Sequence, residues 1–288
     1  MSVKWDLGGL KWKTLAQRAW TKINQDDVLG RSAQLSYYFL LALFPLLLFL
    51  MTLLGYFAEA GSQLRNSLLR YLSTVMPYSA LQLVQTTLDE VSKARGGGKL
   101  SFGILAALWA ASNGMGAISE TLNIAYDVKE TRSWWKVRLI SVGLTVGLAL
   151  LIISALVIVL LGGRIADSVA AASGFGAVFI ITWKILQWPI ALAFLFTTFA
   201  LIYYFAPNLP NPKWQWITPG SLAAVVLWLL VSLGLRAYLH FFDSYSATYG
   251  SLGALIILML WFYLTGAAIL IGGEINSEIE HAARRASK

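Results

Sequence analysis

Six long stretches of the chain are almost entirely apolar, and short polar segments separate most of them. They fall near residues 35–58, 101–124, 137–162, 177–204, 216–241 and 250–276. About 20 mostly apolar residues are needed to cross the hydrocarbon core of a bilayer, and each stretch exceeds that length. The pattern therefore predicts an all-α polytopic membrane protein with six transmembrane helices.

Two polar segments repeat apolar residues at helical spacing. Residues 10–23 place Trp12, Leu15, Ala16, Ala19 and Ile23 on one face, which predicts an amphipathic helix that lies on the inner leaflet or packs under the bundle. Residues 58–99 repeat apolar side chains at 64, 68, 72 and 75, and again at 81, 84, 88 and 91. That spacing predicts a pair of amphipathic helices, which would cap the bundle, lie on the outer leaflet or meet a partner protein.

The placement of charge predicts how the helices are oriented. Of the 22 Lys and Arg side chains, 14 fall on the side of the N-terminus, six fall on the other side, and Lys184 and Arg236 lie within spans. The positive-inside rule then puts both termini in the cytoplasm. We expect a cytoplasmic segment over 1–31, a six-helix domain over 32–276 with an extracytoplasmic helical loop over 59–99, and a cytoplasmic tail over 277–288.

Composition narrows the class further. The chain is 58% hydrophobic and only 12% charged, and it has no cysteine. The lack of cysteine excludes disulfides and thiolate metal sites, and we expect no metal or cofactor. The net charge of +8 is explained by topology, and no nucleic acid partner is expected because no stacking motif accompanies it.

Polar side chains within the second span form the clearest candidate site. Ser112, Gly116, Ser119, Glu120, Asn123 and Asp127 follow a helical spacing, with Asn113 beside them. Two interpretations remain open: small and polar residues let helices pack closely, or the stripe lines a wet cavity. Asn113, Glu120 and Asn123 are therefore candidates for a substrate pathway.

Further candidates lie at the two ends of the bundle. Glu274 and Asn276 sit at the inner end of the sixth span. Ionisable groups inside a membrane are expensive and often functional. In the outer half, an outward-facing basic cavity would combine four residues, unless the basic chains only extend to the headgroups: Arg164, Lys184, Arg236 and Asp243.

Prolines interrupt two spans. Pro45 lies in the first span and Pro189 in the fourth, and both are predicted to kink helices whose freed carbonyls are satisfied within the bundle. Gln34 and Tyr38 share a face before Pro45, and they complete the set of pathway candidates.

Four motifs carry a resemblance to a known family. They are "AQLSYYFLLALFP" (33–45), "ASNGMGAISETLNIAYDVKETRSWWKVR" (111–138), "APNLPNPKWQWITPGSLAA" (206–224) and "YGSLGALIILMLWFYLTGAAILIGGEIN" (249–276). Together they resemble the YihY/BrkB family of bacterial inner-membrane proteins, from about residue 26 to 276. The resemblance implies a multi-pass protein of the bacterial plasma membrane with six helices and cytoplasmic termini. Asn113 and Glu120 are more polar than the family pattern at their positions.

Three functions compete. The family has been labelled both a ribonuclease and a virulence factor, but the residues show no Ser-His-Asp order, phosphate loop or ligand set for two metals, so we expect no enzyme activity. The favoured hypothesis is a transporter or flippase for a lipid or an anionic amphipathic envelope molecule, with membrane lipids as partners. The alternative is a non-transporting scaffold that binds envelope proteins through residues 58–99.

Overall fold

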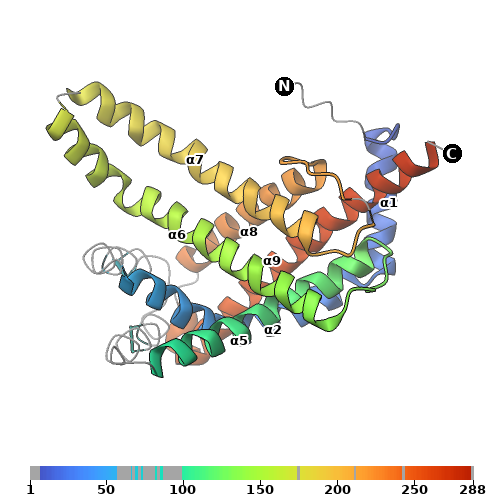
Figure 1. Ribbon diagram of the computed structural model, residues 1–288, viewed down its shortest axis with the longest axis horizontal. Helices are drawn as coiled ribbons and strands as arrows, with labels where there is room; N and C mark the ends of the chain where they lie inside the picture. Colours follow the sequence, from blue (N-terminus) through green and yellow to red (C-terminus); the bar gives the residue numbers. More distant parts are fainter. Residues whose placement is uncertain are drawn as a thin grey trace.

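The computed structural model describes residues 7–56, 66, 69–70, 73, 82, 85–86, 99–173, 176–210, 212–241 and 244–286, and for some helical residues it describes only the backbone. Its helices are α1 (Trp12–Gln25), α2 (Val28–Tyr56), α5 (Lys99–Ala125), α6 (Trp134–Ser173), α7 (Gly176–Phe205), α8 (Pro219–Phe241) and α9 (Ser244–Ala286) (Figure 1). Because the described residues form no strand, the all-α prediction is confirmed for them. The helix pair expected between 58 and 99 lies almost wholly outside the described residues.

Four described helices are long and apolar enough to cross a membrane. The spans are Trp134–Leu160, Val178–Phe205, Pro219–Leu239 and Leu255–Arg285. The two other expected spans coincide with α2 and α5, and a count of six spans stays a prediction. Pro45 and Pro189 both lie inside continuous helices. Helix α9 has 43 residues, or ~65 Å at 1.5 Å per residue, so it extends well beyond the hydrocarbon core.

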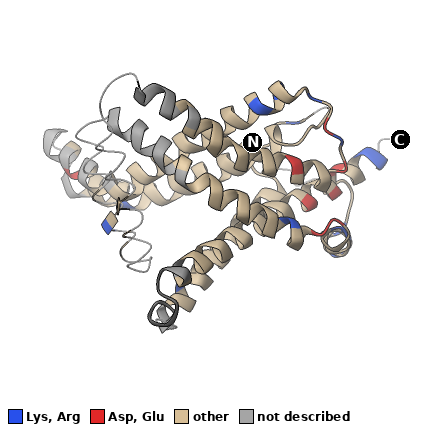
Figure 2. Cartoon of the chain, turned by 90° about the horizontal axis from the view of Figure 1, so that it is seen from below, with Lys and Arg blue, Asp and Glu red and all other residues tan. Residues whose placement is uncertain are grey.

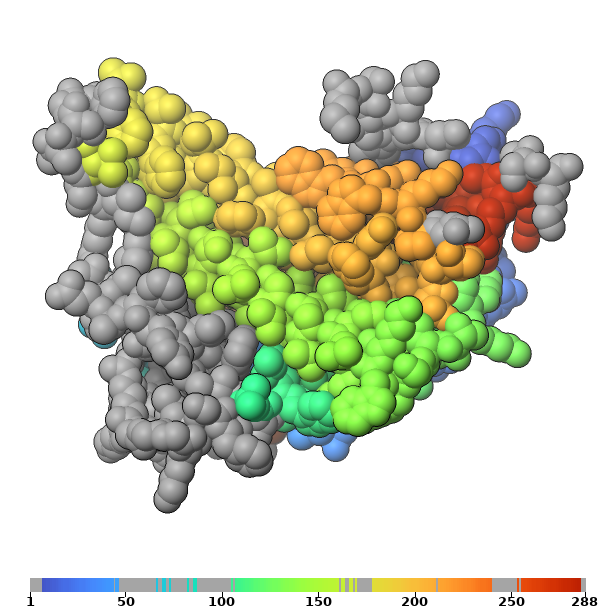
Figure 3. Space-filling view, viewed as in Figure 1, coloured from blue at the N-terminus to red at the C-terminus, as the bar shows by residue number. Residues whose placement is uncertain are grey.

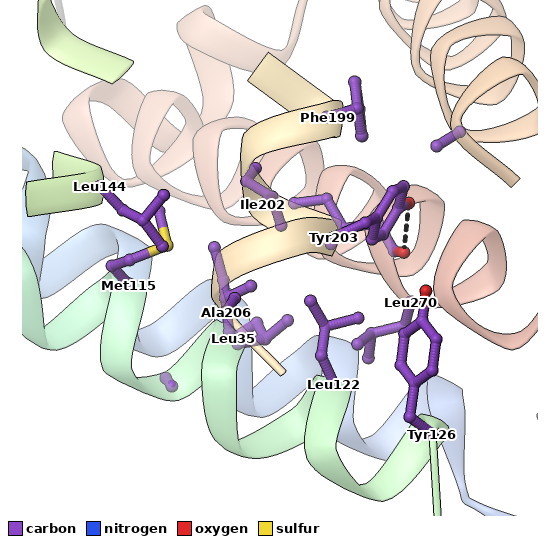
Figure 4. Packing of buried hydrophobic residues seen from close by; sticks show 14 of the residues in the cluster. Leu35, Met115, Leu122, Tyr126, Leu144, Phe199, Ile202, Tyr203, Ala206 and Leu270 are labelled. Atoms are coloured by element: carbon purple, nitrogen blue, oxygen red, sulfur yellow. Dashed lines mark hydrogen bonds between the residues drawn. The ribbon is translucent and has the colours of Figure 1, made fainter. Parts of the chain in front are cut away.

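Helix α9 occupies the centre of the described bundle and packs against α1, α2, α5 and α8. The apolar core of the described residues joins Leu35 of α2, Leu122 of α5, Tyr203 of α7 and Leu270 of α9 (Figure 4). The Tyr203 hydroxyl donates to the Ile269 carbonyl oxygen at 2.8 Å, which satisfies the one polar group of that buried ring. The core therefore ties α7 to α9 near the end where the chain termini lie.

Helices α6 and α7 form a hairpin whose far end diverges from the other helices (Figures 1 and 3). The half of α7 near its C-terminal end buries Phe196, Phe199 and Tyr203, whereas Ile181, Ile185 and other apolar residues of the far half are exposed. Exposed apolar side chains are favourable in lipid, because lipid tails are as apolar as the side chains themselves. The charged residues of α9 and the neighbouring segments lie mostly at the opposite end (Figure 2).

Helix α1 packs against α9 and α2, the second of the two arrangements expected for it. Leu15 and Ala19 are buried, while Trp12 remains 61% exposed and Ala16 is exposed as well. Only part of the predicted apolar face therefore meets the bundle. Trp20, 68% exposed, extends the uncovered face.

Candidate functional site

Helices α2 and α5 approach closely where α5 carries a glycine. A Cβ atom on Gly114 would lie 3.3 Å from the Cβ of Ala42 and 3.6 Å from a ring carbon of Phe39. Small residues at a helix crossing let the two backbones come together, as is common in membranes. Ala42 also lines a groove between the two helices.

The α2–α5 groove has a volume of about 410 Å³ and is lined by Tyr38, Leu41, Ala42, Ala110, Asn113, Ala117 and Glu120. Alanines provide the space, because their side chains end at Cβ. Leu41 is 54% exposed and Asn113 and Glu120 are exposed, so the groove opens at the side of the bundle. It places three of the predicted pathway residues together: Tyr38, Asn113 and Glu120.

A guanidinium group lies beside the groove. Arg138 of α6 donates to Asn113 Oδ1 at 2.7 Å and to the Trp109 carbonyl oxygen. Its guanidinium carbon is 3.8 Å from the centre of the Trp109 ring, a cation–π geometry that fixes the group. Glu120 has no ion-pair partner in the part of the chain that the structure describes. The groove thus combines a fixed cation near its middle with an unpaired carboxylate about 10 Å along α5, at 1.5 Å per residue.

The polar stripe of α5 is divided between two faces. Ser112, Ser119 and Asn123 are buried against neighbouring helices and loops, whereas Asn113 and Glu120 face the groove. Part of the stripe thus packs against neighbouring elements and part lines the groove, and the substrate pathway stays a prediction.

Asn123 belongs to a joint between two loops, formed with Glu130, Arg132 and Asn208. Its Nδ2 donates to Glu130 Oε2 at 2.9 Å, and its Oδ1 accepts from the Asn208 backbone N–H at 2.6 Å. Arg132 donates to both Glu130 oxygens and to the carbonyl oxygens of residues 205 and 206. These hydrogen bonds, those of Arg132 first, lower the pKa of Glu130 to about 2.

A network of charges connects α1, the end of α5 and α9. Lys22 Nζ lies 2.7 Å from Asp127 Oδ2 and 3.6 Å from Asp26 Oδ2, and His281 Nδ1 lies 3.9 Å from Asp127. Partial burial alone lowers the pKa of Lys22, but its bond to Asp127 and the charge of Asp26 raise it above the usual value. Glu274 is completely buried beside this group. We call these five residues the inner-end network.

Asn276 links α9 to two other elements. Its Oδ1 accepts from the Gly220 backbone N–H at 3.0 Å, and its side chain hydrogen-bonds to Tyr126. Burial raises the pKa of Tyr126 well above its usual value, so this phenol stays neutral. Like Asn123, Asn276 is engaged with protein groups in this structure.

The described residues do not show the candidates for the outer basic cavity coming together. Lys184 of α7 and Arg236 of α8 are both exposed, and neither has an ion-pair partner among the described side chains. Gln34 is exposed on α2 and is absent from the groove lining. The Arg164 side chain and Asp243 lie outside the described residues, so the outer basic cavity stays a prediction.

Sequence reasoning missed two partners. Arg138 was counted only for topology, and the Lys22–Asp26 pair, four residues apart on α1, was not connected with Glu274. Helical spacing marks which residues share a face, but it does not say which helix that face meets. The one sequence feature that could have pointed to a role for Arg138 was its position one turn into α6, where a basic side chain can reach a neighbouring helix.

The long apolar helices and the polar groove at their side define a multi-pass α-helical membrane protein. The family model described as "Virulence factor BrkB" matches residues 19–288, so the chain belongs to the BrkB virulence factor family, as its motifs suggested. It is 41% identical over 251 residues to the "Putative ribonuclease-like protein YfkH" of Bacillus subtilis (strain 168), covering 86% of this chain and 88% of that protein.

More distant relatives are named simply as membrane proteins. The chain is 27% identical over 273 residues to the "UPF0761 membrane protein VV0203" of Vibrio vulnificus (strain YJ016), covering 90% of this chain and 80% of that protein. No solved structure matches the chain. Among the described residues, no group of three His, Cys, Asp or Glu side chains is placed to hold a metal ion.

Proposed function

We propose that the protein is a transporter or flippase-like protein of the bacterial plasma membrane that moves a lipid or an anionic amphipathic envelope molecule. The observation that carries the proposal is the α2–α5 groove. A polar headgroup is expensive to place in hydrocarbon, whereas a groove with polar side chains lets it move while its acyl chains stay in lipid. The apolar lip formed by Leu41, which is 54% exposed, suits those chains.

The polar groups of the groove complement a phosphorylated amphiphile. The Asn113 amide and the Tyr38 hydroxyl can donate hydrogen bonds to phosphate oxygens. The Arg138 guanidinium, whose Nη1 lies 2.7 Å from Asn113 Oδ1, adds a positive potential. Glu120, exposed and unpaired among the described residues, would attract an amine carried on the same headgroup. A zwitterionic phospholipid therefore fits better than an uncharged lipid.

The test is lipid movement in proteoliposomes, measured with fluorescent phospholipids of different headgroups and a membrane-impermeant quencher. Ala110→Phe fills the groove and is expected to slow movement by about tenfold or more, or ~1.4 kcal/mol of barrier. Ala237→Phe, on an exposed position of α8, is the matched control for added bulk and should retain the wild-type rate.

Two further variants separate the groove from the predicted outer basic cavity. Lys184→Ala and Arg236→Ala should leave the rate unchanged if the groove alone is the pathway. An equal loss in Ala110→Phe and Ala237→Phe would contradict a specific role for the groove. A folded wild-type protein that moves no lipid or anion in a broad panel would favour the scaffold, and capture of partners through residues 58–99 would then be tested.

A further inference from the structure

Glu274 is an acid that the proposed pathway does not use. Its side chain is 0% exposed, whereas Glu278 on the next turn retains 9% exposure. Removing an ionised carboxylate from water costs several kcal/mol unless donors replace the water. Neither Glu274 oxygen accepts a hydrogen bond from any N–H or O–H of the described residues.

The groups that face Glu274 come from three elements. Lys22 and Asp26 belong to the end of α1, Asp127 follows α5, and all three act on Glu274 electrostatically. Tyr126, also after α5, stays neutral as a buried phenol and interacts with Glu274 and Glu280. Arg31 Nε of α2 donates to the Asp26 backbone carbonyl oxygen at 2.7 Å, so it fixes the backbone at Asp26.

Among the described residues, the ammonium group that acts on Glu274 is that of Lys22, and it already binds other carboxylates. Lys22 Nζ makes bonds of 2.9 and 2.7 Å to the two Asp127 oxygens and lies 3.6 Å from Asp26. Three carboxylates therefore share one Lys22 charge, with His281 3.9 Å from Asp127 as the next group outward. The Asp127 side chain is 48% exposed and the Asp26 side chain 17%, so the group that lacks both water and a donor is Glu274. Its negative charge requires a compensating cation or proton.

Of the described side chains, the Asp26 carboxylate acts most strongly on Glu274, and Asp26 Oδ2, like both Glu274 oxygens, is buried with no donor. Two carboxylates can share a hydrogen bond only when one of them carries a proton. We propose that Glu274 and Asp26 form a proton-binding site. In it, the O–H group of protonated Glu274 donates a hydrogen bond to the Asp26 carboxylate and thereby holds α1 against α9. A metal cation fits less well, because it would face the fixed Lys22 ammonium beside the same Asp26 oxygen.

Release of the proton has a structural consequence. It would leave the fully buried Glu274 carboxylate ionised beside the Asp26 carboxylate, whose Oδ2 is buried as well, and like charges repel strongly in a buried environment. Because Asp26 ends α1 and Glu274 lies on α9, separation of these helices is the direct way to hydrate both groups. Proton release is thus coupled to undocking of α1 from the inner end of the bundle.

Infrared spectroscopy of the full-length protein in nanodiscs tests the site directly. The wild type should show the carbonyl stretch of a protonated, buried carboxyl group at neutral pH, and Glu274→Gln should remove it. Glu280→Gln is the matched control, since Glu280 pairs with Arg284 at 2.6 Å near the surface, and it should keep the band. Asp26→Asn should weaken the band, because Glu274 loses a negative neighbour and gains an amide donor.

Distance measurements test the coupling. The chain contains no cysteine, so spin labels can be attached to Gln17→Cys on α1 and Arg285→Cys on α9, both exposed positions. Raising the pH should lengthen the label-to-label distance in the wild-type background and leave it unchanged with Glu274→Gln.

Three results would overturn the site: no carboxyl band in the wild type at neutral pH, a band that survives Glu274→Gln, or a band removed by Na⁺ at constant pH, which would make the ligand a metal cation. If Glu274→Gln fails to fold, the Asp26→Asn spectrum decides. None of these measurements depends on lipid movement, so they are independent of the proposed function.

Discussion

At the scale of single residues, two acidic groups near the chain termini, Asp127 and Glu130, are held in place by basic partners. Asp127 adopts a left-handed backbone conformation with φ of 52°, which costs a residue with a Cβ about 1–2 kcal/mol. Its carboxylate binds Lys22 at 2.7 Å, and this ion pair joins the end of α5 to α1. Glu130 is held in the same way by Arg132 across the loop joint.

The loop joint predicts a stability change in acid. The pKa of Glu130 falls from its ordinary 4.5 to about 2 in the folded chain. A lowered folded pKa gives stability that is present above the ordinary value and lost as the pH falls toward the folded value. The difference in thermal unfolding midpoint between wild type and Glu130→Gln should therefore be large at pH 6 and shrink as the pH falls from about 4.5 to about 2.

Asp167→Asn is the control for this acid series. Asp167 is exposed and has no ion pair among the described residues, so its substitution should give a difference that does not follow pH in this way. A Glu130→Gln difference that stays constant over the same range would show that Arg132 does not stabilise the folded state through this carboxylate.

At the scale of elements, close backbone contact between α8 and α9 fixes the centre of the bundle. A Cβ on Gly272 would lie 2.6 Å from the Gly220 carbonyl oxygen and 2.8 Å from the Ala224 Cβ, and it would overlap the Tyr203 hydroxyl. These neighbours are backbone or tightly packed atoms, so they cannot move aside cheaply. Glycine is required here by the close approach of the two helices.

Gly272→Ala is therefore expected to destabilise the protein by about 1–3 kcal/mol, the usual effect of overpacking. Gly234→Ala on α8 is the matched control, because a Cβ there meets nothing within 4 Å and alanine favours a helix by up to about 1 kcal/mol. Thermal unfolding in detergent should separate the two variants. Equal midpoints for both would contradict the described packing of α8 on α9.

At the scale of the whole molecule, a packed inner end contrasts with a hairpin that diverges at the other end (Figure 1). In the described part of the chain, four helices are long and apolar enough to cross a membrane. The charged residues near the C-terminal end of α9 and in the neighbouring segments lie mostly at one end (Figure 2). The Lys and Arg distribution predicts that this end faces the cytoplasm, and this orientation stays a prediction.

Single cysteines in the cysteine-free chain test the orientation. Lys13→Cys and Arg285→Cys should react with a membrane-impermeant maleimide only after the cells are opened, because both are expected in the cytoplasm. Lys93→Cys, in the predicted extracytoplasmic loop, should react in intact cells. Labelling of Lys13→Cys from outside would reverse the topology and move the inner-end network to the outer surface.

Much of the molecule followed from the sequence alone. Runs of more than 20 apolar residues dictate membrane helices whatever their neighbours, because backbone groups in lipid must be satisfied within the helix. The motifs around Pro45, Asn113 and Asn276 were sufficient to identify the family, which the match over residues 19–288 confirms. Tyr38, Asn113 and Glu120 were selected as polar residues within spans.

Only the tertiary structure decided which helix each face meets. It divided the α5 stripe, because Asn123 belongs to the loop joint and Glu120 lines the groove. It also packed α1 against α9, which brings Asp26 near Glu274. Helical periodicity is a one-dimensional signal that fixes the direction of a side chain around its own axis. The partner at the end of that direction depends on how helices far apart in the chain pack together.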